Sequence, residues 1–277
     1  MKIMKNHFKE KGYVIASDVI KHNIHAEIFF MFYDLAISCI ARNNIKTNFS
    51  IKKIDEVNYP KDLKELDKLL LTILHLNNKL IGELYDTVSY SSTFLKLISD
   101  SFMEDKTREL LDLKKNNTIY SWNHRIRIDP PRDNRKTYGW HQEIFYTFSD
   151  TKFLQTWAPI MRDTTLENGT IEICVGSSKE GIAKQTWNDI DGRATQIIVD
   201  EKIVKKYEQK PMPMKTGEVM FFDPHTFHKS GQNSTKDEIR FSLVGMWNDT
   251  TYKNFRAPKP EFNSRTISAK ENFNKRI

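Results

Sequence analysis

Two short segments of the sequence carry side chains that could hold a metal ion together. His141-Gln-Glu143 places an imidazole and a carboxylate two residues apart, and in an extended strand or a tight turn such residues point to the same side. His228 offers a second imidazole later in the chain. Two imidazoles and one carboxylate on one face of an iron(II) ion leave coordination positions open, an arrangement suited to oxygen activation.

The spacing of His141 and Glu143 is weak evidence by itself. With eight histidines and 36 acidic residues in the chain, a pair of this kind is expected by chance, and His25-Ala-Glu27 is a second example. That second pair falls in a segment with a helical pattern, where residues two apart do not face one another. The first pair stands in a strand-rich region after a Pro-Pro loop, which favours it as the functional one.

Arg240 and Ser242 indicate a carboxylate site near these ligands. The guanidinium of Arg240, twelve residues after His228, could bind a carboxylate through two parallel hydrogen bonds. Ser242 would point to the same side of a strand and could add a third bond. Together they suit a dicarboxylate that is bound to the metal at one end and anchored at the other. Taken singly, Arg240 also fits a surface position and His228 an ordinary loop.

The chain after about residue 115 reads as strands separated by turns. β-Branched and aromatic residues dominate six segments, mostly with alternation, and Asp, Asn, Gly, Pro and Ser cluster between them. The predicted strands cover 119–128, 153–160, 171–175, 195–199, 218–222 and 239–247. Because no helical pattern alternates with these strands, we expect an antiparallel sandwich or jelly roll and not a parallel sheet.

The chain before residue 115 reads as helices. Apolar residues from Leu63 to Leu84 recur at steps of three and four, which predicts one amphipathic helix of about 25 residues with Pro60 in its first turn. Asn77 interrupts the apolar stripe and the repeat is short, so a helix that covers the core is favoured over a coiled coil. Segments 25–41 and 92–113 are the other predicted helices.

The length of 277 residues suits a single domain with three parts. We expect a mostly helical support over 1–115, a jelly-roll core with the metal site over 116–250, and a basic tail over 251–277. Lys and Arg outnumber Asp and Glu by 43 to 36, and most of the net charge of +7 falls in the tail.

The composition also bears on compartment and partners. The charge is accompanied neither by a nucleic-acid-binding motif nor by an apolar run long enough to span a membrane. We therefore expect no nucleic-acid partner, no membrane and a cytoplasmic location, and the sequence leaves the oligomeric state open. Cys39 and Cys174 are expected to be reduced and buried.

Five blocks of sequence, taken in order, carry a family resemblance. They are Gly-Trp-His-Gln-Glu at 139–143, a strand with Trp157, the segment 167–181 that begins Glu-Asn-Gly-Thr, Lys-Thr-Gly-Glu-Val-Met-Phe-Phe at 215–222, and His-Lys-Ser-Gly-Gln-Asn at 228–233 followed by Arg240. In this order they resemble the phytanoyl-CoA dioxygenase family of iron(II)/2-oxoglutarate oxygenases. Segment 8–15 also resembles the family's N-terminal lead-in, so the resemblance spans most of the chain.

The resemblance implies a mainly β core, a double-stranded β-helix (jelly roll), with the α-helical N-terminal part packed on it. It makes His141, Glu143 and His228 the metal ligands. It makes Arg240 the anchor for the far carboxylate of 2-oxoglutarate.

Three more residues follow from the resemblance as cofactor-binding candidates. Trp157 falls where the family places an aromatic side chain beside the cosubstrate, although an ordinary core position fits it equally well. Gln155 points to the same strand face as Trp157 and could touch cosubstrate or substrate. Ser242 could support the arginine two residues before it.

The chain departs from the family at one ligand and offers a rival for another. Most members have Asp where this chain has Glu143. Relatives that halogenate carry a small residue there to leave room for chloride, so Glu143 argues against that chemistry. His225 competes with His228 as the distal ligand, but the Ser-Gly-x-Asn after His228 and its interval to Arg240 favour His228.

The implied reaction is the hydroxylation, or another oxidation, of an aliphatic C–H in a small metabolite. It would consume O2 and 2-oxoglutarate at iron(II) and release succinate and CO2. One alternative is a non-catalytic jelly-roll binding protein derived from the family, against which the intact ligands count. The other is a zinc-dependent hydrolase or isomerase, which gives Arg240 no role.

The substrate class is left open by the family, whose members act on acyl-CoA thioesters, amino-acid derivatives, carrier-bound intermediates, phosphonates and natural products. Arg125 and Arg127, on the strand that enters the site, are the candidate contacts to an anionic substrate. The helical half and loop 129–139 are expected to form the mouth. The cations of that loop, which also fit a solvated segment, are Arg132, Arg135 and Lys136.

Overall fold

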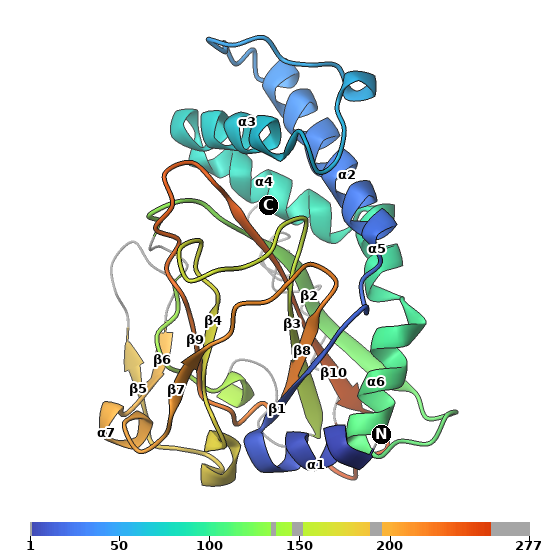
Figure 1. Ribbon diagram of the computed structural model, residues 1–277, viewed down its shortest axis with the longest axis vertical. Helices are drawn as coiled ribbons and strands as arrows, with labels where there is room; N and C mark the ends of the chain where they lie inside the picture. Colours follow the sequence, from blue (N-terminus) through green and yellow to red (C-terminus); the bar gives the residue numbers. More distant parts are fainter. Residues whose placement is uncertain (1, 134–136, 146–151, 189–195, 256–277) are drawn as a thin grey trace, which may run out of the picture.

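The computed structural model describes residues 2–133, 137–145, 152–188 and 196–255, and its centre is a pair of antiparallel sheets (Figure 1). The larger sheet has the strand order β1 (Tyr13–Ala16), β8 (Val219–Phe222), β3 (Phe153–Pro159), β10 (Arg240–Asp249), β2 (Ile119–Asp129). The smaller sheet has the order β7 (Gln209–Pro211), β4 (Ile171–Cys174), β9 (His228–Ser230), and a separate pair is formed by β5 (Gln185–Asn188) and β6 (Gln196–Val199). The expected jelly roll is confirmed.

Alternation along β10, an interior strand, decides what each face of the larger sheet contacts. Phe241 and Leu243 are buried in the main hydrophobic core, which the helices share. Val244, on the other face, packs beside Trp157, and this apolar group extends to Ile173 of the smaller sheet. Apolar side chains of both sheets therefore line part of the space that the two sheets enclose.

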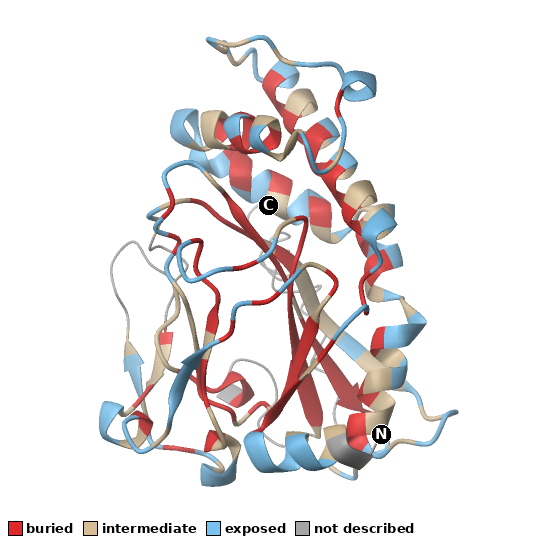
Figure 2. Ribbon diagram, in the orientation of Figure 1, coloured by how far each residue is buried: buried red, intermediate tan, exposed pale blue. Residues whose placement is uncertain are grey.

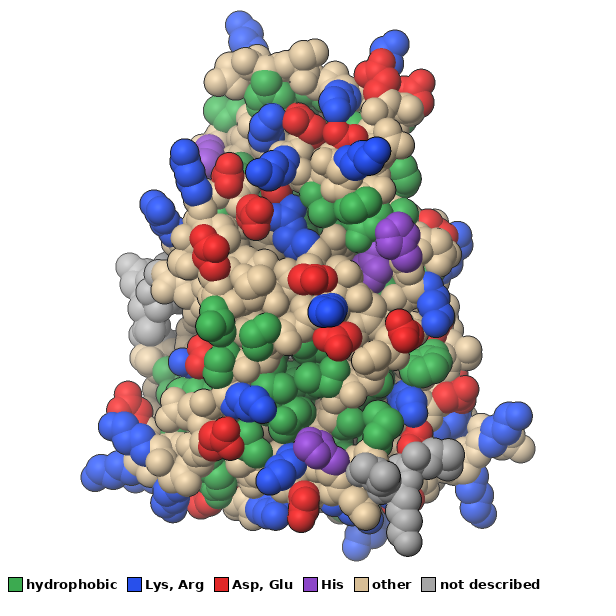
Figure 3. Space-filling view, in the orientation of Figure 1, with side chains coloured by type: hydrophobic (Ala, Val, Ile, Leu, Met, Phe, Trp, Pro, Cys, Tyr) green, Lys and Arg blue, Asp and Glu red, His purple; other side chains and the backbone are tan. Residues whose placement is uncertain are grey.

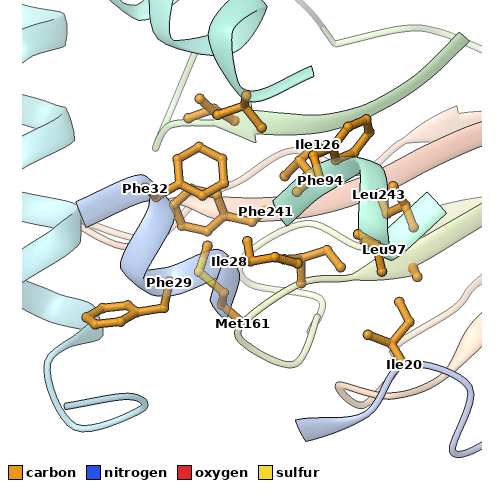
Figure 4. Packing of buried hydrophobic residues seen from close by; sticks show 14 of the residues in the cluster. Ile20, Ile28, Phe29, Phe32, Phe94, Leu97, Ile126, Met161, Phe241 and Leu243 are labelled. Atoms are coloured by element: carbon orange, nitrogen blue, oxygen red, sulfur yellow. The ribbon is translucent and has the colours of Figure 1, made fainter. Parts of the chain in front are cut away.

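The helices cover the outer face of the larger sheet with their buried stripes turned toward it (Figure 2). Phe32 of α2 lies against Phe241 of β10 with ring centres 5.2 Å apart, and both side chains are fully buried (Figure 4). The longer helices are α1 (Lys2–Lys11), α2 (His22–Arg42), α3 (Leu63–Leu76), α4 (Asn78–Ser89), α5 (Ser92–Ile98) and α6 (Ser101–Leu111). The short helices are α7 (Glu201–Val204), η1 (Ile54–Glu56), η2 (Glu143–Phe145) and η3 (Ser177–Glu180).

The expectation that no apolar run is long enough to span a membrane is wrong for one segment. By length and composition alone, α2 is the one helix of the described chain that could cross a membrane, with a mean hydropathy of 1.5 over 18 residues. It packs against α3, α4 and α5. Ile28, Phe29 and Ala36 on α2 have no exposed surface. The apolar composition is thus explained by a position in the core.

The predicted single helix over 63–84 is wrong, because the chain forms α3 and α4 with a break at Asn77. That residue is extended, with φ −157° and ψ 101°, and its side-chain oxygen accepts a hydrogen bond from the backbone of Lys79. An N-cap of this kind begins a new helix while the apolar spacing continues across it. Pro60 lies before the N-cap Asp62 and not in the first turn.

Segment 92–113 likewise forms two helices and not one. Asp100 stands between α5 and α6, and its carboxylate accepts a hydrogen bond from the backbone of Phe102.

Among the described residues, four strands were not predicted from the sequence. They are β1, β5, β7 and β9, each of three or four residues.

Charged side chains of both signs are spread over the surface seen in Figure 3, and the two cysteines are buried. On the face shown in Figure 3, basic and acidic side chains are interspersed and do not gather by sign. Cys39 and Cys174 are both free and buried, as expected. Most of the basic tail, 256–277, lies outside the described residues.

Candidate metal centre

His141, Glu143 and His228 converge on one point between the sheets. The Nε2 atoms of His141 and His228 each lie 3.8 Å from Oε2 of Glu143, and the donor atoms of all three lie within 4.8 Å of one another. Two backbone hydrogen bonds join His141 to His228, at 3.0 and 3.1 Å. The amide of Glu143, at the start of η2, donates to the carbonyl of Pro224 at 3.1 Å. The backbone thus fixes both ligand segments against each other.

Both imidazoles are held in the orientation and tautomer that a metal requires. Nδ1 of His141 lies 2.7 Å from the carbonyl of Gly139, and Nδ1 of His228 lies 3.0 Å from the carbonyl of Thr226. A carbonyl can only accept, so each Nδ1 carries the proton and each Nε2 presents its lone pair. Burial lowers the pKa of His141 to about 4 and that of His228 well below its ordinary value. Both side chains are therefore neutral ligands at physiological pH.

Glu143 completes the donor set with a buried carboxylate. Burial raises its pKa, while a hydrogen bond from Gln155 and the positive charges of Arg125 and Arg127 act in the opposite direction. A divalent cation at this point would offset the cost of burying the negative charge. Two neutral imidazole nitrogens and one carboxylate oxygen are the donors that iron(II) takes in non-haem oxygenases, so the residues fit the metal that the sequence implies.

A cavity of about 360 Å³ opens onto the three ligands. The candidate site residues Gln155 and Trp157 of β3, Arg125 and Arg127 of β2, and Arg240 of β10 all line it. Its other lining residues are Tyr85, Asn123, Ile128, Asp129, Tyr138, Ile171, Phe222, Lys229, Ser230, Val244 and Met246.

Two buried polar atoms on the cavity side of the sheet have no hydrogen-bond partner among the described residues. They are Oε1 of Gln155 and Oγ of Ser242. Ser242 does not itself line the cavity, but it lies on the strand face between Arg240 and Val244, which do. Buried polar atoms are nearly always bonded, so these two are placed to meet a polar ligand.

Strand β2 lines the cavity with a row of polar side chains, since alternate residues of a strand share a face. The row is Asn123, Arg125, Arg127 and Asp129. Asn123 has a positive φ of 54°, and the pairing of β2 with β10 shifts register near this point, as in a β-bulge. Asp129 pairs in register with Arg240 at the opposite end of the row.

Arg240 is buried and bonded on both sides of its guanidinium. Nε and Nη2 donate to Oδ2 of Asp129 at 3.3 and 2.9 Å. Nη1 donates to the carbonyls of Gly231, at 2.8 Å, and of Gly169. Arg127 binds the same Asp129 carboxylate through Nε and Nη2. The expected anchor thus lines the cavity as part of a cluster with a second arginine and an aspartate.

Other predicted residues lie away from the three ligands or outside the described chain. His225 is partly exposed, and its Nδ1 lies 3.0 Å from Asp223. Arg132, at the edge of loop 129–139, does not line the cavity. Arg135 and Lys136 lie outside the described residues.

Three residues at or beside the candidate site were not indicated by the sequence. The Pro-Pro sequence after Asp129 predicts only a turn there, yet Asp129 is the buried partner of Arg240. Tyr85 of α4 reaches the cavity from the helical half. Gln142 is fully buried, and its side chain makes hydrogen bonds with Gly181, Ala183, Gln185 and the carbonyl of His225. Its position in the sequence between two candidate metal ligands was the only indication of this role.

Solved structures with this architecture cover nearly the whole chain. EvdO2 from Micromonospora carbonacea var. aurantiaca, solved with 2-oxoglutarate, is 16% identical, with a TM-score of 0.53 over 94% of this chain and 95% of that one. The epimerase SnoN, solved with Fe3+, alpha-ketoglutarate and nogalamycin RO, is 16% identical, with a TM-score of 0.58 over 94% and 88%. EctD from S. alaskensis is 16% identical, with a TM-score of 0.55 over 94% and 80%. At this identity the likeness establishes the fold.

A family model supplies the assignment that the folds alone do not. The model of phytanoyl-CoA dioxygenase (PhyH) matches residues 76–242. The matched range is more than half of the chain, and it includes the three converging residues His141, Glu143 and His228 as well as Arg240 and Ser242. On this evidence the chain belongs to the phytanoyl-CoA dioxygenase (PhyH) family.

Proposed function

We propose that the protein is an iron(II)- and 2-oxoglutarate-dependent dioxygenase that hydroxylates, or otherwise oxidises, an aliphatic C–H of a small metabolite. The observation that carries this proposal is the convergence of His141, Glu143 and His228, with both Nδ1 atoms fixed by backbone carbonyls. Family membership and the cofactors bound in EvdO2 and SnoN support it.

The protein's own residues hold and orient the reacting groups. Iron(II) and 2-oxoglutarate, when bound, supply the activation of O2 and the decarboxylation that yields succinate and CO2. His141, Glu143 and His228 would hold the metal on one face. Gln155 hydrogen-bonds the Glu143 carboxylate and so restricts its rotation. Glu143 fills the carboxylate position, which argues against halogenation.

The cosubstrate would lie between the metal and Arg240. Gly231, whose carbonyl accepts a hydrogen bond from Arg240, follows His228 by three residues, and three residues of extended chain span about 10 Å. A five-carbon dicarboxylate chelated at one end fits a separation of this size. Ser242 is placed to add a hydrogen bond, and Trp157 supplies an apolar wall.

The substrate would be a small anionic molecule bound beside Arg125. Arg125 lines the cavity, lies close enough to Glu143 to influence its pKa, and hydrogen-bonds the neutral side chain of Asn123. Lys229, by contrast, lies 3.1 Å from Glu172, which balances its charge. A cation in the cavity wall with a neutral partner favours an anionic group on the substrate.

Addition of iron(II) and 2-oxoglutarate to the purified protein under argon tests the proposal. We expect a weak visible charge-transfer band in the wild type and its loss in His141→Ala and His228→Ala. His225→Ala is the matched control, because it removes an imidazole from the same loop without touching the three ligands, and it should keep the band. A wild type without the band, or a His141→Ala protein that still forms succinate, would contradict the assignment.

One observation favours the alternative of a non-catalytic jelly-roll binding protein. Asp129 already occupies the edge of Arg240 that a cosubstrate carboxylate would need. A binding protein would show neither the band nor succinate release with any candidate metabolite. A zinc-dependent hydrolase or isomerase would instead turn over without O2, so oxygen dependence separates the third class.

A further inference from the structure

Arg127, Asp129 and Arg240 form one cluster at the wall of the cavity. The carboxylate of Asp129 lies 2.9 Å from a guanidinium nitrogen of each arginine. The side chain of Asp129 is 10% exposed and that of Arg240 5% exposed. All three residues line the cavity that holds the metal ligands, so an anion bound there would meet the cluster as a unit.

The hydrogen-bond donors of Arg240 are almost fully used. A guanidinium has five N–H groups. Nη1 donates to the carbonyls of Gly169 and Gly231, and Nε and Nη2 both donate to Oδ2 of Asp129. The Nε and Nη2 edge is a fork that can bind a carboxylate through two parallel bonds. Asp129 therefore occupies the place where the distal carboxylate of a cosubstrate would bind.

The charge of the cluster leaves room for one further carboxylate. The two guanidiniums hold the pKa of Asp129 well below its usual value, so its carboxylate is ionised. Counted within the cluster alone, two cations and one anion sum to a charge of +1, which favours the binding of a further carboxylate. The two carbonyls that bind Nη1 keep Arg240 oriented when Asp129 releases the other edge.

We propose that Asp129 is an internal competitor for the distal carboxylate of 2-oxoglutarate, and that Arg127 belongs to the cosubstrate site and not to the substrate site. The cosubstrate takes the Nε and Nη2 edge of Arg240, and Asp129 stays paired with Arg127. Asp129 thus weakens the binding of 1,5-dicarboxylates and sets the 2-oxoglutarate concentration at which the enzyme works. This inference rests on the proposed function.

Calorimetry can test the inference by measuring how three small acids bind to the iron(II)-loaded protein under argon. 2-Oxoglutarate has both the 2-oxo acid end and the distal carboxylate, glutarate lacks the 2-oxo group, and pyruvate lacks the distal carboxylate. In Asp129→Asn we expect 2-oxoglutarate and glutarate to bind at least tenfold more tightly and pyruvate to bind within twofold of the wild type. Unchanged or weaker binding of 2-oxoglutarate would overturn the inference.

Two further variants keep the test decisive. Glu172→Gln removes the same charge beside the cavity-lining Lys229 without touching either arginine, and it should leave all three affinities within twofold. If it tightens 2-oxoglutarate as much as Asp129→Asn does, competition at Arg240 is the wrong explanation. Arg127→Gln should weaken 2-oxoglutarate and glutarate at least tenfold and spare pyruvate. Unchanged affinities in Arg127→Gln would place that arginine outside the cosubstrate site.

The same measurements separate this inference from the proposed function. A wild type that binds no 2-oxoglutarate and forms no visible band refutes the proposed function itself. A wild type that binds 2-oxoglutarate, with an Asp129→Asn protein that binds it no better, refutes only the role of Asp129.

Discussion

Gly231 should not tolerate a side chain. It follows β9, the strand that begins at His228, and its carbonyl accepts a hydrogen bond from Arg240. A Cβ added there would lie 2.2 Å from the carbonyl oxygen of Thr170. The chain segments at Thr170 and Gly231 would have to separate until that contact reached the 3.4 Å or more of ordinary van der Waals packing. This movement would break the hydrogen bond from the Gly231 amide to Thr170, now 2.8 Å, and carry the Gly231 carbonyl away from Arg240.

The expected cost of Gly231→Ala combines these losses. Overpacking costs about 1–3 kcal/mol. A lost backbone hydrogen bond costs about 1 kcal/mol, and a lost bond to a charged group about 1.5–3 kcal/mol. Since the contributions overlap, we expect the free energy of unfolding to fall by about 3–5 kcal/mol. The affinity for 2-oxoglutarate should fall as well, because one acceptor that orients Arg240 is displaced.

Urea unfolding followed by circular dichroism measures the stability change, and Gly82→Ala is the matched control. Gly82 is exposed inside α4, and no atom of the described chain lies within 4 Å of the place that its Cβ would take. Alanine there should stabilise the protein by about 0.5–1 kcal/mol, because glycine weakens a helix interior. The two glycine substitutions should therefore have opposite signs. Equal unfolding midpoints for Gly231→Ala and the wild type would refute the steric reasoning.

Three further substitutions have defined outcomes. Burial raises the pKa of Asp67 to about 6 despite Arg162 at 2.7 Å, so the protonated carboxyl stabilises the fold below pH 4 and this contribution is lost as the pH rises through 6. Relative to Asp67→Asn, the unfolding free energy of the wild type should therefore fall by about 3 kcal/mol between pH 4 and 7, as measured by urea unfolding at both pH values. Gln142→Ala leaves several buried groups without a hydrogen bond, so it should lower the free energy of unfolding by about 3 kcal/mol or more and weaken metal binding. Thermal denaturation and calorimetry measure the two effects, and an unchanged melting temperature would contradict the prediction. Phe241→Ala, in the core between α2 and the larger sheet, should cost about 3–5 kcal/mol in urea unfolding while metal binding persists in the folded protein.

The parts of the fold that local pattern controls were predictable from the sequence. Strands β2, β3, β4, β6, β8 and β10 were predicted to within two residues at each end, because their β-branched and aromatic residues alternate. The jelly roll followed from the family resemblance. The pair His141 and Glu143 was picked out by its surroundings, and His228 by the block that follows it.

What the sequence did not reveal depends on contacts between distant segments. Asp129 and Arg240 are 111 residues apart, and neither the Pro-Pro turn nor the strand pattern indicates that they form an ion pair. Strand β9 begins at His228 and has three residues, too few to show alternation, so its pairing with β4 decides its structure. Asn77 ends one helix and caps the next while the apolar spacing continues, which hides the break from a periodicity argument.

The pairing of β1 with β8 has a consequence for the order in which the protein assembles during synthesis. Tyr13 faces Phe222 across these strands, and the hydroxyl of Thr226 donates to the carbonyl of Gly12, 214 residues earlier. During synthesis, β1 therefore cannot pair with β8 until most of the chain has left the ribosome. His228 emerges just two residues after Thr226, so β1 can pair with β8 at the same late stage at which the candidate set His141, Glu143 and His228 becomes complete. Binding of iron would then indicate that β1 has paired with β8.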